Sequence, residues 1–424
     1  MWKWTRDPLG FLEECHRDYG KTFTLRSPNV GAIVTTCDPV AVKEIFTAPQ
    51  GTFLSRPSNE ILKPIVGENS LFLLDGEPHR RQKALQFPML NGSTLRGYGD
   101  VMVSATQREL SRWGVGETVN IQQAAERISI EIICKVVYGV ADSELESAAD
   151  TIRRLTHALT PKLLFFPALR TDLGAWSPGG KLKRAFKDVQ SLLGELISER
   201  RKQHTPGTDI LSMLVHVQDE EGEHLSDAEI ADHLLTLLNA GHETTTSALS
   251  WLIHHLHKSP DHLDRLREEI ESLGPNPDSL ALAKAPWLAA CSSESLRLVP
   301  TILSVGRTVH HPFELLGTEI PVGCRVMAAA YLSHRMEDDW EQPEQYNPTR
   351  FLREKPSPYV FYPFGGGART CIGSRFAEME LRVIAGTLLS RTRLTLLDPG
   401  AEPVRKSVAV VPRGGVDVVV ESRC

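Results

Sequence analysis

The 424-residue chain lacks the features that mark several large classes of protein. No stretch approaches the roughly 20 uninterrupted apolar residues that cross a bilayer, and the N-terminus lacks the apolar run of a signal peptide or anchor. The seven cysteines are scattered and include no Cys-x-x-Cys pair, which argues against a zinc knuckle or a disulfide scaffold and favours a reducing compartment. We therefore expect a soluble, cytoplasmic protein with no stable membrane anchor.

The charge balance and the composition exclude further classes. The net charge is −6, so nothing in the overall balance indicates a nucleic-acid-binding protein. The hydrophobic content of 41% is ordinary for a globular protein with a large core. Because the chain contains no internal repeat, low-complexity tract or long linker, we expect residues 1–424 to form a single domain, and we expect a monomer.

A glycine-rich loop that ends in a cysteine, Phe364–Gly373, is the most informative segment. Glycines let the backbone pass close to a flat ligand. Cys371 precedes a predicted helix, Ser374–Leu389, whose positive end favours a thiolate, and Arg369 adds a positive charge. This combination suits an anionic sulfur ligand for a metal held under a planar cofactor. The alternative is a glycine hairpin followed by a buried structural cysteine.

A second informative segment lies in a long predicted helix from Asp227 to about Lys258. Ser226 and Glu229 form a capping-box pattern at its start. Its middle, Ala240–Thr246, is poor helix material, since glycine alone costs about 1 kcal/mol there. The threonine hydroxyls could simply bond to carbonyls one turn earlier. We favour a local distortion that opens room for a small ligand beside the acid–alcohol pair of Glu243 and Thr244.

The remaining pattern predicts a helix-rich protein with small peripheral sheets. Strand-like runs occur near both ends of the chain, and helical patterning dominates the middle. Gly414-Gly415 predicts a hairpin between the last two strand-like runs, Val408–Val411 and Val416–Val420. Glu294 and Arg297 lie three residues apart on a predicted helix and can pair. Alone, such a pair is usually a surface salt bridge of little worth.

Taken together, these segments resemble the cytochrome P450 family. The loop Phe364–Gly373 is similar to its haem-binding signature, and Ala240–Thr246 to its central helix. Glu294 and Arg297, with Arg350 further along the chain, match its core motif, whose members support the cysteine loop and are not catalysts. The resemblance covers nearly the whole chain and implies a mainly α fold with small β-sheets, arranged as a triangular helical prism with a β-rich lobe.

The resemblance implies heme b as the cofactor, with Cys371 as the ligand of its iron. A cysteine thiolate pushes electron density towards bound oxygen and favours cleavage of the O–O bond. Lys83 stands where relatives often carry arginine, and lysine offers a point charge without the bidentate fork. The positions that match haem contacts in the family are His79, Lys83, Ala240, Arg307, Phe364, Gly365, Arg369, Cys371 and Gly373.

The resemblance also implies a haem-thiolate monooxygenase, which inserts one atom of dioxygen into a C–H or C=C bond. Thr244 would hydrogen-bond bound dioxygen, and Glu243 would take part in proton delivery. No flavin or nicotinamide domain is recognisable, so electrons would come from a separate ferredoxin-type partner and its reductase. A peroxide-driven peroxygenase usually lacks the acid–alcohol pair. A haem-binding gas sensor or carrier would need neither that pair nor a substrate cavity.

The segments that line the substrate pocket in relatives are mostly apolar in this chain and show no cluster of charges. We therefore expect a lipophilic substrate, such as a terpenoid, a steroid, a fatty acid or another natural product. The same apolar residues could equally belong to the core. The candidate pocket residues are Leu73, Phe166, Thr236, Asn239, Leu303 and Val408.

Overall fold

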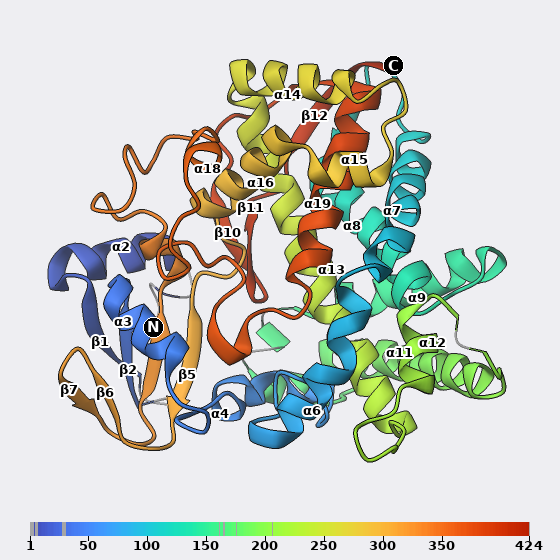
Figure 1. The fold of residues 1–424 in the computed structure, drawn as a ribbon. Helices are drawn as coiled ribbons and strands as arrows, with labels where there is room; N and C mark the ends of the chain where they lie inside the picture. Colours follow the sequence, from blue (N-terminus) through green and yellow to red (C-terminus); the bar gives the residue numbers. More distant parts are fainter. Residues whose placement is uncertain are drawn as a thin grey trace.

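The computed structural model describes residue 4 and residues 7–27, 31–160, 162–163, 166–174, 176–205 and 207–423. Helices make up most of the fold, and the strands lie partly at the left and partly in the centre and at the top of Figure 1. The prediction of a mainly α protein with small peripheral sheets is confirmed.

The described helices are spread over most of the chain. The longer ones are α2 (Pro8–Tyr19), α3 (Pro39–Thr47), α6 (Gly76–Gln86), α7 (Thr94–Leu110), α8 (Ile121–Ile132), α9 (Leu145–Ala158), α11 (Pro178–Arg201), α12 (Ile210–His216), α13 (Asp227–His257), α14 (Pro260–Ser272), α15 (Ser279–Lys284), α16 (Pro286–Leu298) and α19 (Ser374–Arg391). The short ones are α4 (Arg56–Asn59), α5 (Lys63–Val66), α17 (Ala330–Ser333) and α18 (Arg350–Arg353).

Within the described part of the chain the strands form four small sheets. The largest has the order β1 (Thr22–Ser27), β2 (Gly31–Thr36), β8 (Arg325–Ala328), β5 (Val305–Val309) and β3 (Phe53–Leu54), with only β2 and β8 parallel. A second sheet has the order β4 (Thr118–Asn120), β12 (Asp417–Arg423) and β9 (Thr392–Leu396). Two hairpins complete the set: β6 (Phe313–Leu315) with β7 (Thr318–Ile320), and β10 (Pro403–Lys406) with β11 (Ala409–Pro412).

The predicted hairpin across Gly414-Gly415 is wrong. Strand β11 pairs with β10, whereas β12 lies between β4 and β9. Both glycines have positive φ, so they turn the chain out of one hairpin and into another sheet. Alternate residues of β12, Val418 and Val420, are fully buried and face the main core. Burial of this face determines the partners of β12, and a turn signal alone cannot reveal it.

Helix α13 crosses the core, as Figure 1 shows, and packs against α8, α16 and α19. The predicted capping box of Ser226 and Glu229 is present. The expected distortion near Gly241 is absent, because the helix runs without a break from Asp227 to His257. The Thr244 hydroxyl instead donates to the Ala240 carbonyl at 2.6 Å, which is the simpler alternative.

Candidate functional site

The cysteine loop is held in one conformation by its own backbone. The Cys371 N–H donates to the Phe364 carbonyl at 3.0 Å, and the Gly365 N–H donates to the Tyr362 carbonyl at 2.9 Å. Gly365 and Gly367 both have φ near +70° (69° and 67°), a region that favours glycine. A Cβ atom on Gly367 would also collide with the backbone oxygen of Phe46. The loop therefore needs glycine at these positions in order to place the thiol.

The Cys371 thiol lies beside backbone that leaves room around it. Its residue has accessible surface, yet the thiol lies deep enough in the fold for desolvation to raise its pKa. The Gly373 N–H and the charge of Lys83 act in the opposite direction on that pKa. Gly373 and, on α13, Gly241 border open space, since a Cβ atom on either would meet no atom within 4 Å.

Four basic side chains, His79, Lys83, Arg307 and Arg369, lie near the cysteine loop and close enough to act on one another's pKa values, and Asp75 is the carboxylate beside three of them. Burial, together with the charge of Arg369, lowers the pKa of Arg307 to about 10. Burial, then the charges of Arg369 and Lys83, lower the pKa of His79 to about 4. Arg369 itself pairs with Asp75. This excess of half-buried basic groups fits a planar group that carries two carboxylates, as heme b does.

Two of these side chains, Lys83 and Arg369, also hold a piece of backbone. The Lys83 ammonium donates to the carbonyls of Ala368 (2.8 Å) and Thr370 (3.2 Å), so it fastens α6 to the cysteine loop. Arg369 donates to the Leu71 carbonyl at 2.8 Å. These contacts orient the cations before any ligand binds.

The acid–alcohol pair is partly buried on α13. Atom Oε1 of Glu243 is inaccessible to solvent and has no hydrogen-bond partner among the described residues. Burial raises the pKa of Glu243 to about 7, although Lys406, the Ser407 side chain and the Val408 N–H oppose the shift. A buried carboxyl group with an unpartnered oxygen and a pKa near neutrality is suited to hold and release a proton.

The sequence analysis missed Glu126 and His157, which together with His242 lead from the pair Glu243 and Thr244 towards the surface. Glu126 on α8 places its Oε1 3.5 Å from His242 Nε2 on α13 and 3.3 Å from His157 Nε2 on α9. Burial raises the pKa of Glu126, but His242, Lys406 and His157 outweigh it and bring the value to about 2. The His157 side chain is largely exposed. No local motif marks Glu126 or His157, because both stand in ordinary amphipathic helices.

The pair Glu294 and Arg297 is buried, and the surface-bridge interpretation is wrong. Both side chains are 0% exposed and share two hydrogen bonds of 2.7 and 2.8 Å. Arg350 joins them through Nε, 3.1 Å from Glu294 Oε1. Arg297 also donates to the carbonyls of His334 and Gln345. The three side chains thus tie α16 to the segment that leads into the cysteine loop, which suits a scaffold.

The candidate substrate residues fall into different environments. Leu73 and Leu303 are buried. The Thr236 hydroxyl donates to the Asp232 carbonyl and lies 2.8 Å from Ser70 Oγ, and the Asn239 amide donates to Leu235. These polar groups therefore already have partners within the protein.

Phe166 and Val408 are the two exposed candidates, and Phe166 is mostly exposed. No hydrogen bond among the described residues joins Phe166 to the cysteine loop. The assignment of all six residues to a substrate pocket stays a prediction.

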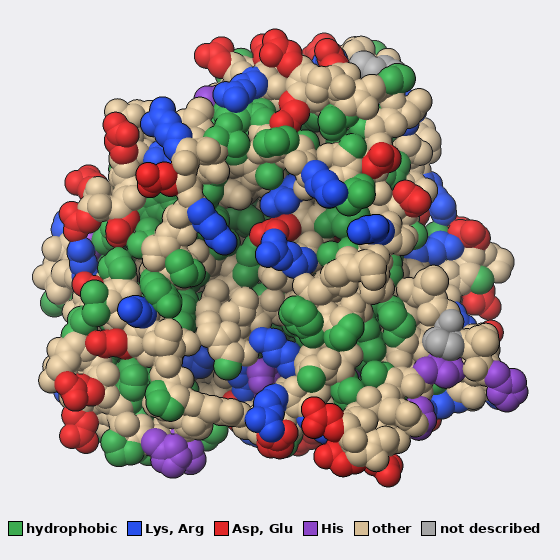
Figure 2. All heavy atoms as spheres, viewed as in Figure 1, with side chains coloured by type: hydrophobic (Ala, Val, Ile, Leu, Met, Phe, Trp, Pro, Cys, Tyr) green, Lys and Arg blue, Asp and Glu red, His purple; other side chains and the backbone are tan. Residues whose placement is uncertain are grey.

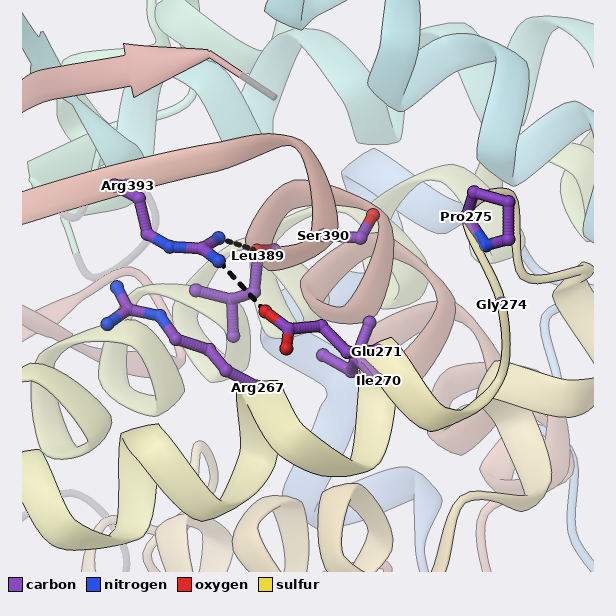
Figure 3. Close-up of a pocket in the computed structure, with 8 residues that line it drawn as sticks. All are labelled: Arg267, Ile270, Glu271, Gly274, Pro275, Leu389, Ser390 and Arg393. Atoms are coloured by element: carbon purple, nitrogen blue, oxygen red, sulfur yellow. Dashed lines mark hydrogen bonds and ion pairs between the residues drawn. The ribbon is translucent and has the colours of Figure 1, made fainter.

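A separate hollow of about 310 Å³ lies at the other end of α19, about 25 Å from Cys371 by the rise of a helix. Figure 3 shows the Arg393 guanidinium directed at Glu271, to which it is bonded at 3.0 Å. The ion pair occupies the polar side of this hollow, and none of the predicted site residues lines it.

A helical fold in which a glycine-rich loop presents a cysteine beside half-buried basic side chains is typical of a haem-thiolate protein. Comparison with known proteins agrees, because the family model described as Cytochrome P450 matches residues 2–416. Two Mycobacterium tuberculosis proteins are similar over nearly the full length. Cytochrome P450 138 is 32% identical, covering 96% of this chain and 90% of its own, and cytochrome P450 135B1 is 30% identical, covering 98% and 88%.

Solved structures are similar as well. Cyanobacterial CYP120A1, whose structure has retinoic acid bound, has a TM-score of 0.86 at 26% identity and covers 99% of this chain and 97% of its own. The cytochrome P450DA heme domain has a TM-score of 0.87 at 22% identity, and the match covers 98% of this chain and 93% of that domain. At this identity the likeness supports the fold alone. The chain belongs to the cytochrome P450 family. It is a haem-thiolate monooxygenase that binds heme b through a cysteine thiolate. Among the described residues no helix is long and apolar enough to span a membrane.

Proposed function

We propose that this enzyme inserts one atom of dioxygen into a lipophilic small molecule, with Cys371 as the iron ligand and Glu243 and Thr244 as the proton-delivering pair. The observation that carries the proposal is the buried acid of Glu243 beside an alcohol on α13, the helix that crosses the core. When bound, heme b supplies the activation of dioxygen by electrons. A gas carrier has no use for such a pair, and a peroxygenase can act without it.

The residues around the cofactor then have distinct tasks. The loop backbone and Lys83 hold the Cys371 thiol in place, and the positive charge nearby favours its ionised form. Arg307 and Arg369 supply cations for two carboxylates, and His79, whose pKa of about 4 leaves it neutral at pH 7, supplies an N–H donor; all three side chains are half-buried, which strengthens hydrogen bonds to a charged group.

Protons reach Glu243 from the Glu126 group in this proposal. Glu126 remains ionised and orients His242, while the exposed His157 exchanges protons with solvent. Glu243 can hold a proton near neutral pH because burial disfavours its charged form. Thr244 follows Glu243 in the helix, and the hydrogen bond that its hydroxyl donates to the Ala240 carbonyl orients that hydroxyl.

Two observations support the choice of substrate and electron donor. Leu73 and Leu303 are apolar and buried, and the similar CYP120A1 structure holds retinoic acid, so a lipophilic substrate is favoured. Lys and Arg side chains are spread over the middle of the face in Figure 2, and Arg80 and Arg375 are exposed on α6 and α19 beside the cysteine loop. Such a face suits an acidic partner of the ferredoxin type, itself reduced by a reductase. A cytoplasmic, monomeric, single-domain enzyme is part of the same proposal.

The experiment is Thr244→Ala, assayed with a ferredoxin, its reductase and a bound lipophilic compound. Removal of one hydroxyl leaves the fold intact, so heme b content and compound binding are expected to match the wild type. Proton positioning typically contributes about 10²–10⁴-fold to rate, so more reducing equivalents should end in hydrogen peroxide and fewer in product. An unchanged ratio of product to reducing equivalents would remove Thr244 from the mechanism and favour the peroxygenase.

A further inference from the structure

Asp75 stands at the N-cap position of α6, yet its side chain does not cap that helix. Aspartate at such a position usually accepts from the first turn of its own helix. The Asp75 carboxylate instead accepts from the backbone N–H groups of Ser55 at 2.9 Å and Arg56 at 3.0 Å, and it pairs with the Arg369 guanidinium. The side chain is only 16% exposed, so its charge lies beside the cysteine loop and not in solvent.

Through these contacts one carboxylate joins three segments: the start of α4, the start of α6 and the cysteine loop. Arg369 is held from a second side as well, because it donates to the Leu71 carbonyl at 2.8 Å and to the Leu74 carbonyl. With its donors divided between a carboxylate and two carbonyls, the Arg369 guanidinium has a fixed orientation.

The charges of this site match those of heme b in size. Burial and neighbouring cations lower the pKa of His79 to about 4, so His79 is neutral at pH 7, whereas Lys83, Arg307 and Arg369 are cations. In the described part of the chain, no carboxylate other than that of Asp75 lies within ion-pair distance of these four side chains. Three cations and one carboxylate leave two positive charges, and the two carboxylates of heme b carry two negative ones.

We propose that Asp75 is a positioning residue that sets the reduction potential of the heme iron, by fixing Arg369 and by limiting the positive charge of the site to what the two heme carboxylates neutralise. This rests on the assignment of the cations to those carboxylates in the proposed function. Positive charge in excess favours the ferrous state, which holds one electron more. Asp75 therefore keeps the potential low, and the electron donor must have a correspondingly low potential.

A purely structural role is the alternative, because the same hydrogen bonds would hold α4 against the cysteine loop without any effect on the iron. Loss of a structural contact lowers the thermal midpoint and leaves the reduction potential where it was. Loss of a half-buried charge changes the potential, since water and salt screen such a charge only weakly. The potential therefore separates the two roles.

The test is spectroelectrochemical titration of the heme-loaded protein without substrate or redox partner. In Asp75→Asn the ferrous-to-ferric ratio at a fixed applied potential should rise at least about threefold, which is a midpoint about 30 mV more positive at about 59 mV per tenfold. Asp75→Glu keeps the charge and should return the midpoint towards the wild type. The matched control is Glu77→Gln on α6, where the side chain is 66% exposed and paired with Arg80, and it should leave the midpoint unchanged.

A second set of variants serves if Asp75→Asn takes up heme poorly. The Arg307 guanidinium donates to the carbonyl of the preceding residue, Gly306, at 2.8 Å, so its removal releases no distant segment. Arg307→Gln should lower the midpoint. The double variant Asp75→Asn with Arg307→Gln should return the midpoint close to that of the wild type, because the loaded site is again neutral. Heme content and the thermal midpoint are measured for each variant.

Three outcomes would overturn the proposal. The midpoint of loaded Asp75→Asn could equal that of the wild type. Glu77→Gln could shift the midpoint as far as Asp75→Asn does, which would make the net charge of the whole protein the cause. Lastly, the double variant could have the same midpoint as Arg307→Gln alone. None of these measurements involves Thr244 or a substrate, so their failure is distinct from a failure of the proposed function.

Discussion

Replacement of Glu126 by glutamine should lower the pKa of Glu243. Burial raises the pKa of Glu243 to about 7, and the negative charge of Glu126 adds to the shift. Glutamine keeps the shape and removes the charge. One pKa unit corresponds to about 1.4 kcal/mol, so a fall of one unit would reduce the protonated fraction of Glu243 at pH 7 from about one half to about one tenth.

The same substitution should change how stability depends on pH. The pKa of Glu126 is lowered from 4.5 to about 2, so its pairing stabilises the fold above pH 4.5 and is lost as the pH falls through 2. The difference between the unfolded and folded pKa values of Glu126 corresponds to about 3 kcal/mol in the free energy of unfolding. In Glu126→Gln this part of the acid dependence should disappear from denaturant unfolding curves measured between pH 5 and pH 2.

Infrared difference spectroscopy measures the expected fall in the pKa of Glu243, since a protonated carboxyl has its own C=O stretching band. Subtraction of the Glu243→Gln spectrum identifies the Glu243 band, which is then followed against pH. The control is Glu131→Gln, on the same helix α8, where the carboxylate lies 3.4 Å from Arg108. Equal midpoints in the wild type and Glu126→Gln, or equal shifts in both variants, would refute the link between Glu126 and Glu243.

Three further changes test the cysteine loop and its support. Cys371→Ser should retain some heme but lose the red-shifted Soret band of the ferrous carbon-monoxide complex, and persistence of that band would disprove the ligand assignment. Glu294→Ala should lower the free energy of unfolding by roughly 3–5 kcal/mol, because it leaves the buried Arg297 without its carboxylate, and should yield protein with little heme. Full heme loading together with wild-type stability in denaturant would contradict this expectation. Gly367→Ala should lower the free energy of unfolding by about 1–3 kcal/mol because of its positive φ alone, and the measurement is how much heme the variant retains after heating.

The sequence predicted those parts of the site whose residues are close together in the chain. The cysteine loop and the acid–alcohol pair are local patterns, and their assignment to a site stays a prediction. Glu126 and His157 could not be found in this way. Their meeting with His242 depends on how α8 and α9 pack against α13, and no periodicity encodes that packing.

The two wrong expectations have a related cause. A pair of glycines after Val411 indicates a turn but not which strands it joins, and burial of β12 beside β4 and β9 determined the pairing. The residues around Gly241 are weak helix formers, yet packing of α13 along its length keeps the helix regular. In both cases tertiary contacts outweigh a local preference.

The parallel pairing of β2 with β8 has a consequence for synthesis of the chain. Ile33 pairs with Arg325, so β2 leaves the ribosome almost 300 residues before its partner does. Until then the β1–β2 hairpin has an open edge, and an open edge can pair with other chains. Pairing at such a separation is also slow. Truncated forms that end before Arg325 should therefore aggregate, however complete their helices are.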